Sequence, residues 1–228
     1  MTTTTTLTRT RWSADTWPRA AALAATIGAL AFLAGQALLP ELPNDLAPAF
    51  AGMVEHRDQL LAARLLTAAG CFLLVPAAVG YAGLVRRRDV GGTTLRVGAT
   101  LLGIGAFSNA VSQVVQGYAT HAATGATIDR TAGRAMVDHI ASGAAAIPIG
   151  FWSIPAFALG CILVSVGLLR SRRVATWVPV VLIIGTVMAG AFAGQGPIVA
   201  LTQAPATIAL IVLAWFVAHT DSDPNSCA

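Results

Sequence analysis

The chain has 228 residues, of which 56% are hydrophobic and only 11% are charged. This composition excludes an ordinary soluble domain and indicates a membrane protein with a single domain. All 14 basic residues are arginines that cluster beside apolar runs, so the formal charge of +4 reflects membrane topology and predicts no nucleic-acid partner.

Six apolar runs are long enough to cross a hydrocarbon core of about 30 Å. They cover residues 20–39, 60–85, 97–118, 143–169, 175–194 and 198–218. Residues 1–18 form a Thr-rich tail, residues 19–219 a single membrane domain, and residues 220–228 a polar tail. The sequence therefore predicts an all-α, polytopic bundle of six transmembrane helices.

Charge asymmetry predicts the orientation of these spans. The arginines near residues 9–19, 86–96 and 170–173 fall on one side, which the positive-inside rule makes cytoplasmic. Both termini then lie in the cytoplasm of a bacterial cell, beneath its inner membrane. The connections 40–59 and 119–142 lie outside with most of the carboxylates. Prolines 40, 43 and 48 predict an irregular first connection, and a short surface helix is expected from Asp129 in the second.

Two stretches of the chain follow one plan. Met53-Val54-Glu55-His56 and Met136-Val137-Asp138-His139 each precede a long apolar run that ends in arginines. In front of them, Arg19, Ile27-Gly28-Ala29 and Gln36 recur as Arg96, Ile104-Gly105-Ala106 and Gln113 at the same offsets. We therefore predict two helical-hairpin repeats, 19–88 and 96–173, and a third hairpin, 175–219. An acid–histidine pair is expected to start the second helix of each repeat.

Several polar residues lie within the predicted spans. Asn109, Ser112, Gln113 and Gln116 share one face of the third span. An arginine near the bilayer centre costs about 2.5–3.5 kcal/mol, so Arg64 in the second span is expected to point inward, toward a carboxylate or those amides. One hypothesis is an outward-opening polar pocket. The alternative is that these groups only hydrogen-bond one helix to another.

The pocket hypothesis assigns a role to each candidate residue. Arg64, Asn109, Gln113 and Gln116 would hold a polar head group. Aromatic side chains would shape an apolar interior for the rest of the substrate, and they are Phe151, Trp152 and Phe157, together with Phe72 and Phe107.

The acid–histidine pairs suggest acid–base chemistry. A carboxyl group at the edge of an apolar pocket holds its proton more tightly and can act as a general acid, while a neighbouring histidine can take a proton back. Asp138, Glu55 and Asp58 are the candidate acids, with His139 as a partner. The alternative is that the pairs are charged helix starts, stabilised by the helix dipole.

A metal centre is not expected. His56, His121 and His139 are zinc ligands by type, but adjacent residues on a helix point about 100° apart, so an acid–histidine pair rarely binds one ion. The sequence also carries no nucleotide-binding or dinucleotide-binding fingerprint, so no cofactor is predicted.

The second half of the chain carries a series of residues that resembles part of other membrane proteins. The series consists of His139, Gly143, Ile149-Gly150-Phe151, Gly160-Cys161, Gly167-Leu168-Leu169, Ser171 and Leu182-Ile183-Ile184-Gly185. It resembles the later helices of a group of uncharacterised six-helix bacterial membrane proteins, and the segment around Arg64 is similar to that group's second helix. The resemblance covers residues 19–195 and implies the fold without an activity. A similarity to small integral membrane terpene cyclases, at the level of the class, implies protonation and cyclisation of a prenyl chain, but no motif matches residue by residue.

These observations together predict a metal-free, membrane-embedded acid–base enzyme. Its substrate would be a lipophilic, isoprenoid molecule that enters from the outer half of the bilayer, among the membrane lipids. Two alternatives stay open: a protein that binds or transports a small amphiphile for export or self-protection, and a non-catalytic membrane subunit or sensor. The sequence does not predict an oligomeric state.

Overall fold

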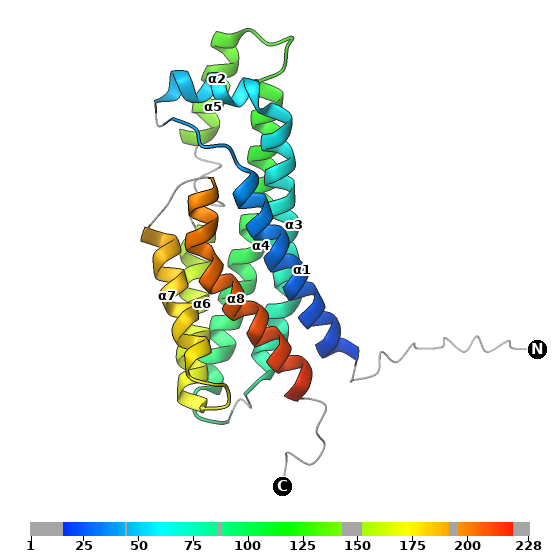
Figure 1. Ribbon diagram of the computed structural model, residues 1–228, viewed down its shortest axis with the longest axis vertical. Helices are drawn as coiled ribbons and strands as arrows, with labels where there is room; N and C mark the ends of the chain where they lie inside the picture. Colours follow the sequence, from blue (N-terminus) through cyan, green and yellow to red (C-terminus); the bar gives the residue numbers. More distant parts are fainter. Residues whose placement is uncertain (1–15, 44, 86–87, 143–151, 192–195, 221–228) are drawn as a thin grey trace, which may run out of the picture.

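The computed structural model describes residues 16–43, 45–85, 88–142, 152–191 and 196–220 (Figure 1). Within these ranges every regular element is a helix, which agrees with the predicted all-α class. The helices are α1 (Thr16–Leu38), α2 (Leu46–Glu55), α3 (Arg57–Gly83), α4 (Gly92–Ala123), α5 (Arg130–Ser142), α6 (Trp152–Ser171), α7 (Trp177–Ala191) and α8 (Pro197–Thr220).

Five of these helices, α1, α3, α4, α6 and α8, are long and apolar enough to cross a membrane. This property suggests a membrane protein. The predicted spans match them to within a few residues, except that α4 has 32 residues and extends beyond 97–118 at both ends. Residues 143–151 of the predicted fourth span lie outside the described ranges. Helix α7, in place of the predicted fifth span, is apolar but has only 15 residues.

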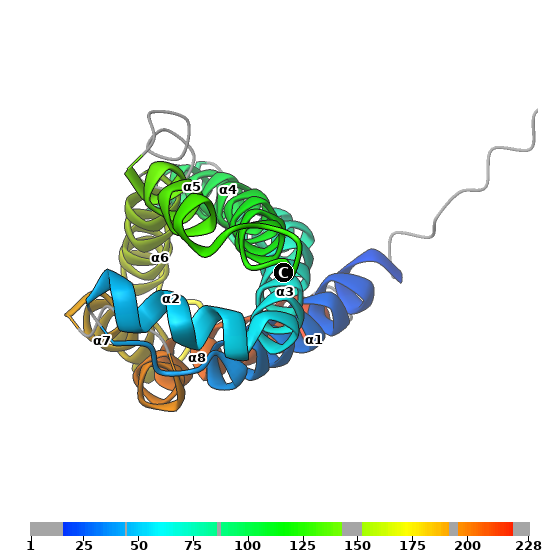
Figure 2. The same cartoon turned by 90° about the horizontal axis from the view of Figure 1, so that it is seen from above.

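The five long helices and the shorter α7 form a closed ring. The order around the ring is α1, α3, α4, α6, α7 and α8, and α8 packs back against α1 (Figure 2). Successive helices run in opposite directions, so α1 begins and α8 ends at the same end of the bundle (Figure 1). We call this end the arginine end, because Arg19, Arg88, Arg96, Arg170, Arg172 and Arg173 lie there. The opposite end carries α2 and α5 and is called the capped end.

The prediction that an acid–histidine pair starts the second helix of each repeat holds in part for the first pair, because His56 is the N-cap of α3, and not for the second pair, which lies within α5. Glu55 is the last residue of α2, His56 forms the junction, and α3 begins at Arg57. Asp138 and His139 lie near the C-terminal end of α5, before α6. The helix-dipole explanation therefore does not apply to Asp138, because a carboxylate is favoured at the N-terminal end of a helix.

The first connection at the capped end is more helical than expected, and the second is helical as expected. Pro48 does not keep the first connection irregular, because it lies in the first turn of α2, where no backbone donor is needed. The short helix predicted from Asp129 is α5. Asp129 Oδ2 accepts hydrogen bonds from the backbone N–H groups of Thr131 (3.0 Å) and Ala132 (3.2 Å), which caps the start of that helix.

The echoed tripeptides occupy equivalent environments in α1 and α4. Ile27 and Ile104 are exposed on the outside of the bundle, whereas Ala29 and Ala106 are buried. The glycine between them meets a neighbouring helix in each case. A Cβ atom on Gly28 would lie 2.8 Å from the Gly70 carbonyl oxygen of α3, and one on Gly105 would lie 2.4 Å from the Phe157 backbone nitrogen of α6. These glycines therefore allow the close helix contacts on which the bundle depends.

Several aromatic residues that were expected in the interior lie on the outer surface. Phe72 is 57% exposed, Phe107 is 51% exposed and Trp152 is 66% exposed. Phe72 and Phe107 contact each other there, with ring centroids 6.4 Å apart. Phe157 is half-buried and packs against the core, and Phe151 lies outside the described residues. Among the described residues, Phe157 is therefore the one member of the expected aromatic interior that packs against the core.

Candidate functional site

One face of α4 changes from apolar to polar as the helix approaches the capped end. Leu95, Leu102 and Ala106 lie on this face and are fully buried in the core. The same spacing of three and four residues continues through Asn109, Gln113, Gln116 and Thr120, and all four are half-buried. These four polar side chains are thus less covered than Leu95, Leu102 and Ala106, while Ala110 and Gly117 beside them are buried.

Arg64 of α3 is held against this polar face. Its Nη1 donates hydrogen bonds to Gln113 Oε1 (2.9 Å) and Gln116 Oε1 (2.8 Å) of α4. Each glutamine then donates further along its own helix, Gln113 Nε2 to Asn109 Oδ1 (3.4 Å) and Gln116 Nε2 to Ser112 Oγ (2.9 Å). The prediction that Arg64 points toward the amides is therefore confirmed for Gln113 and Gln116.

Asn109 extends the network back to α3, because its Nδ2 lies 3.3 Å from Cys71 Sγ. The set of side chains formed by Arg64, Asn109, Ser112, Gln113 and Gln116 is called the amide ladder below. Since the ladder joins α3 and α4 along two turns of each helix, it fixes the guanidinium group in one position.

The positive charge of Arg64 is not balanced by its hydrogen-bond partners. Both acceptors are neutral amide oxygens, and among the described residues no carboxylate forms an ion pair with this guanidinium group. Its Nε atom is buried and has no hydrogen-bond partner among the described residues. A half-buried cation held by neutral groups keeps its attraction for an anion, and a low local dielectric strengthens that attraction.

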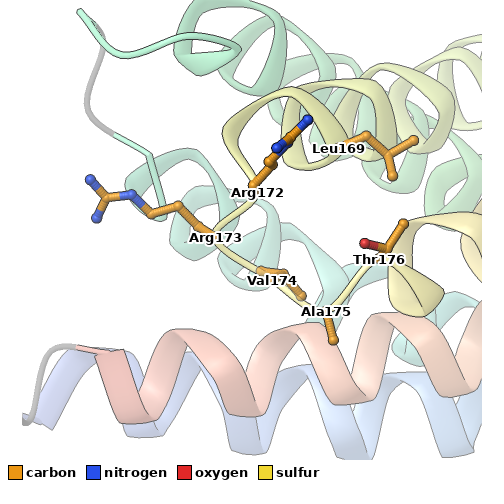
Figure 3. A pocket seen from close by; sticks show the side chains of 6 residues that line it. All are labelled: Leu169, Arg172, Arg173, Val174, Ala175 and Thr176. Carbon is orange, nitrogen blue, oxygen red and sulfur yellow. The ribbon is translucent and has the colours of Figure 1, made fainter.

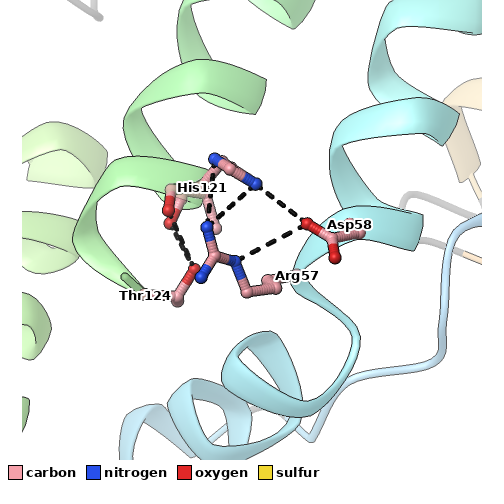
Figure 4. Close-up of polar contacts among 5 residues, drawn as sticks. Arg57, Asp58, His121 and Thr124 are labelled. Carbon is pink, nitrogen blue, oxygen red and sulfur yellow. Dashed lines mark hydrogen bonds and ion pairs between the residues drawn. The ribbon is translucent and has the colours of Figure 1, made fainter. Parts of the chain in front are cut away.

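A second cluster, drawn in Figure 4, lies nearer the capped end than the ladder does, because it joins the start of α3 to the last turn of α4. Arg57 Nη2 lies 3.0 Å from His121 Nε2, and the same His121 atom lies 2.9 Å from Asp58 Oδ1. One ring nitrogen either carries a proton and donates to Asp58, or lacks it and accepts from Arg57. Arg57 Nε also lies 3.6 Å from Asp58 Oδ1. The tautomer of His121 thus decides the role of Nε2, and Nδ1 of the same ring also lies 3.5 Å from Arg57 Nη2.

This second cluster was not predicted from the sequence. His121 was considered only as a zinc ligand by type, and Arg57 was not considered at all. One sequence signal was available, because Arg57 precedes Arg64 by two helical turns and therefore lies on the same face of α3.

The predicted acid–base residues lie in open surroundings. The Asp58 side chain is 86% exposed, and Glu55, Asp138 and His139 are exposed on α2 and α5. Such exposure leaves these carboxylates in contact with solvent, whereas the acid–base hypothesis requires a desolvated proton donor. Asp58 approaches the candidate site through His121.

Helices α2 and α5 lie across the capped end, above the polar groups (Figure 1). A small apolar cluster joins them to α4, and its buried members are Phe50 of α2, Ala123 of α4 and Val137 of α5. The packing is close, since a Cβ atom on Gly133 of α5 would lie 2.3 Å from the Ala123 carbonyl oxygen. The two short helices therefore form one connected cap.

Comparisons of this chain with protein-family models, with curated proteins and with solved structures found no match. The resemblances described above therefore stay predictions, and the function is inferred from the geometry of the chain itself.

Proposed function

We propose that this chain is a membrane protein that binds a lipophilic molecule with an anionic head group. The observation that carries the proposal is the charge of Arg64, which is half-buried among apolar helices and bonded only to amide oxygens among the described residues. An anionic head group would supply the missing negative charge, and an arginine can bind a carboxylate or a phosphate with two parallel hydrogen bonds.

Half-buried side chains support a position for this molecule. Asn109, Gln113 and Gln116 of α4 are half-buried, as are Gln203 of α8 and Phe157 of α6. We infer that the apolar tail lies beside Phe157 and the head group beside the amide ladder.

The proposal includes six spans, with both termini in the cytoplasm of a bacterial cell. Helix α7 would be the additional span, since it packs between α6 and α8 in the ring. Its 15 residues cover about 22 Å at a rise of 1.5 Å per residue, so the bilayer would be thinner beside it. The positive-inside rule supports a cytoplasmic arginine end, although Arg57, Arg130 and Arg134 lie at the capped end. The candidate site then lies in the outer half of the membrane.

Binding, for export or for sequestration, is favoured over catalysis by the exposure of the candidate acids. The acid–base enzyme predicted from the sequence needs a desolvated proton donor close to the bound chain, and Glu55, Asp58 and Asp138 are all exposed. Catalysis on an isoprenoid substrate stays an untested prediction, to be examined by looking for turnover.

A matched pair of probes tests the proposal. Geranylgeranyl phosphate and geranylgeraniol share one tail and differ in the charge of the head group. Titration of the full chain in lipid nanodiscs should give tighter binding of the phosphate. Arg64→Gln should weaken that binding roughly tenfold or more, because it removes a charge-assisted hydrogen-bond donor, while leaving geranylgeraniol unaffected.

The control is Arg96→Gln, which removes the same charge from an exposed position near the start of α4, at the other end of the bundle. It should leave both affinities unchanged. Equal affinity for the two probes in the unmodified chain, or an equal loss in both variants, would contradict the assignment of Arg64.

A further inference from the structure

A depression opens at the arginine end, where the chain turns from α6 into α7 (Figure 3). It has a volume of about 680 Å³, within the range of about 300–1,000 Å³ usual for small-molecule sites. Its lining consists of six consecutive or nearly consecutive residues, namely Leu169, Arg172, Arg173, Val174, Ala175 and Thr176. It lies at the opposite end of the bundle from the amide ladder, so it is a separate site.

The lining carries positive charge and no carboxylate. Arg173 is partly neutralised, because its Nη2 lies 3.1 Å from Asp89 Oδ2 in the segment before α4. In Figure 3 the Arg173 side chain extends away from the depression, whereas Arg172 lies beside Leu169. Arg172 is exposed, and among the described residues it has no ion-pair partner. The depression therefore retains a net positive charge that Arg172 supplies.

The backbone at Arg172 adopts a left-handed conformation that is uncommon for a residue with a side chain. Its φ angle is 52°, the one positive value among the described non-glycine residues. It follows the last residue of α6, and its N–H donates to the Leu168 carbonyl at 3.0 Å, so it occupies the position where a helix commonly ends in glycine. A non-glycine residue there costs about 1–2 kcal/mol. Glycine would fill the turn at lower cost but would bring no charge.

The other residues of the depression suit the boundary between lipid and water. Leu169, Val174 and Ala175 provide an apolar wall, and Thr176 adds an exposed hydroxyl group beside them. Trp177, the first residue of α7, is 53% exposed, and tryptophan is enriched at the level of lipid head groups. A ligand at this position would meet a cation, a hydroxyl donor and an apolar wall together.

We propose that this depression binds the head group of an anionic phospholipid. Arg172 would donate to the phosphate oxygens, Thr176 would donate a further hydrogen bond, and the apolar wall would contact the first carbons of the acyl chains. Basic pockets between transmembrane helices are known sites for such head groups. The lipid would occupy the seam between α6 and α7 and would stabilise the packing of the shortest helix of the ring.

The test uses Arg172→Gly in the full chain. This variant removes the charge and also relieves the backbone strain, so it should fold at least as stably as the unmodified protein. Native mass spectrometry, with dioleoyl phosphatidylglycerol and dioleoyl phosphatidylcholine as competing lipids, should show preferential retention of one phosphatidylglycerol by the unmodified chain. The variant should lose roughly tenfold in that preference.

Arg19→Gln is the matched control, because it removes an exposed arginine at the same end of the bundle on α1, which does not adjoin α6 or α7. An unchanged lipid preference in Arg172→Gly would overturn the proposal, as would an equal loss in Arg19→Gln, which would indicate a diffuse charge effect. Inorganic phosphate alone should not raise the melting temperature of the unmodified chain. If it did so as strongly as the lipid, the site would belong to a soluble anion and the lipid assignment would be wrong.

Discussion

Arg64 of α3 donates a hydrogen bond of 2.8 Å to the side-chain oxygen of Gln116 on α4. The bond orients the guanidinium group without neutralising it, because an amide oxygen carries no formal charge. A carboxylate at the same place would have formed an internal ion pair. Because the partner is glutamine and not glutamate, the contact holds α3 to α4 while Arg64 keeps its attraction for an anion. The two effects can therefore be tested independently.

The first prediction concerns Gln113→Glu. The new carboxylate would keep the acceptor that binds Arg64 Nη1 and would add the opposite charge, at the loss of the long hydrogen bond that Gln113 donates to Asn109. We expect the melting temperature to be maintained or raised and the affinity for geranylgeranyl phosphate to fall roughly tenfold, as for loss of the charge itself. Parallel thermal unfolding and titration would show this. Retained affinity together with raised stability would mean that Arg64 does not meet the head group.

The second prediction concerns Gln116→Leu, which removes one acceptor of Arg64 and the donor to Ser112. Leaving half-buried polar groups without partners costs about 1–3 kcal/mol, so the free energy of unfolding should fall by that amount. Val115→Leu is the control, since Val115 is 53% exposed on the same helix and should tolerate the change. Equal stability of the two variants would show that the ladder does not hold α3 to α4.

The third prediction compares two glycines of α4. A Cβ atom on Gly105 would lie 2.4 Å from the Phe157 backbone nitrogen, whereas one on Gly103 would make an ordinary contact of 3.5 Å with Ala78. Gly105→Ala should destabilise the bundle by about 1–3 kcal/mol through overpacking. Gly103→Ala should be neutral or stabilising by up to about 1 kcal/mol, because alanine favours helix. Thermal unfolding of both variants would detect the opposite signs.

Part of the fold could be predicted from the sequence because it depends on the length of the apolar runs. An apolar run of about 20 residues must form a helix to satisfy its backbone in lipid, so the positions of α1, α3, α4 and α8 followed directly. The break between α2 and α3 could not be predicted. Residues 46–83 are interrupted only at His56, where no proline or glycine marks the end of a helix. Glu55 was therefore expected at the start of the second span and lies instead at the end of α2.

The orientation of apolar residues could not be predicted for a physical reason. Lipid tails are as apolar as the protein core, so no hydrophobic gradient separates the inner face of a membrane helix from its outer face. Phe72, Phe107 and Trp152 were therefore expected inside and lie outside. Polar side chains are costly in lipid and therefore face the inside of the bundle. For this reason the contact of Arg64 with the amides of Gln113 and Gln116 could be predicted.

The fourth prediction concerns the cap over the site. Phe50→Ala would remove the side chain that joins α2 to Val137 of α5 and Ala123 of α4. Hydrogen exchange of the backbone of α2 and α5 should become faster, while exchange in the ring helices stays unchanged. Met136→Ala is the control, because Met136 is 42% exposed on α5 and should leave exchange unaltered. Unchanged exchange in Phe50→Ala would mean that the short helices are not coupled through this cluster.

The fifth prediction concerns the exposed carboxylates. Asp58→Asn removes an ion pair whose acid is 86% exposed, and such pairs contribute about 0–1 kcal/mol, so stability should change little. Affinity for geranylgeranyl phosphate should also be retained in Asp58→Asn and Asp138→Asn. Incubation of the unmodified chain with a prenyl substrate and no ion gradient is expected to yield no product. Product that disappears in these variants would restore the acid–base enzyme and displace the binding function.

The most direct measurement is native mass spectrometry of the full chain purified gently from its native membrane. We predict that an acidic amphiphile, distinct from bulk phospholipid, remains bound to the unmodified protein and to Arg172→Gly. It should be absent from Arg64→Gln, because that variant lacks the cation beside Gln113 and Gln116. The same bound species in all three proteins, or bulk phospholipid alone in the unmodified chain, would contradict the assignment of Arg64 as the head-group cation.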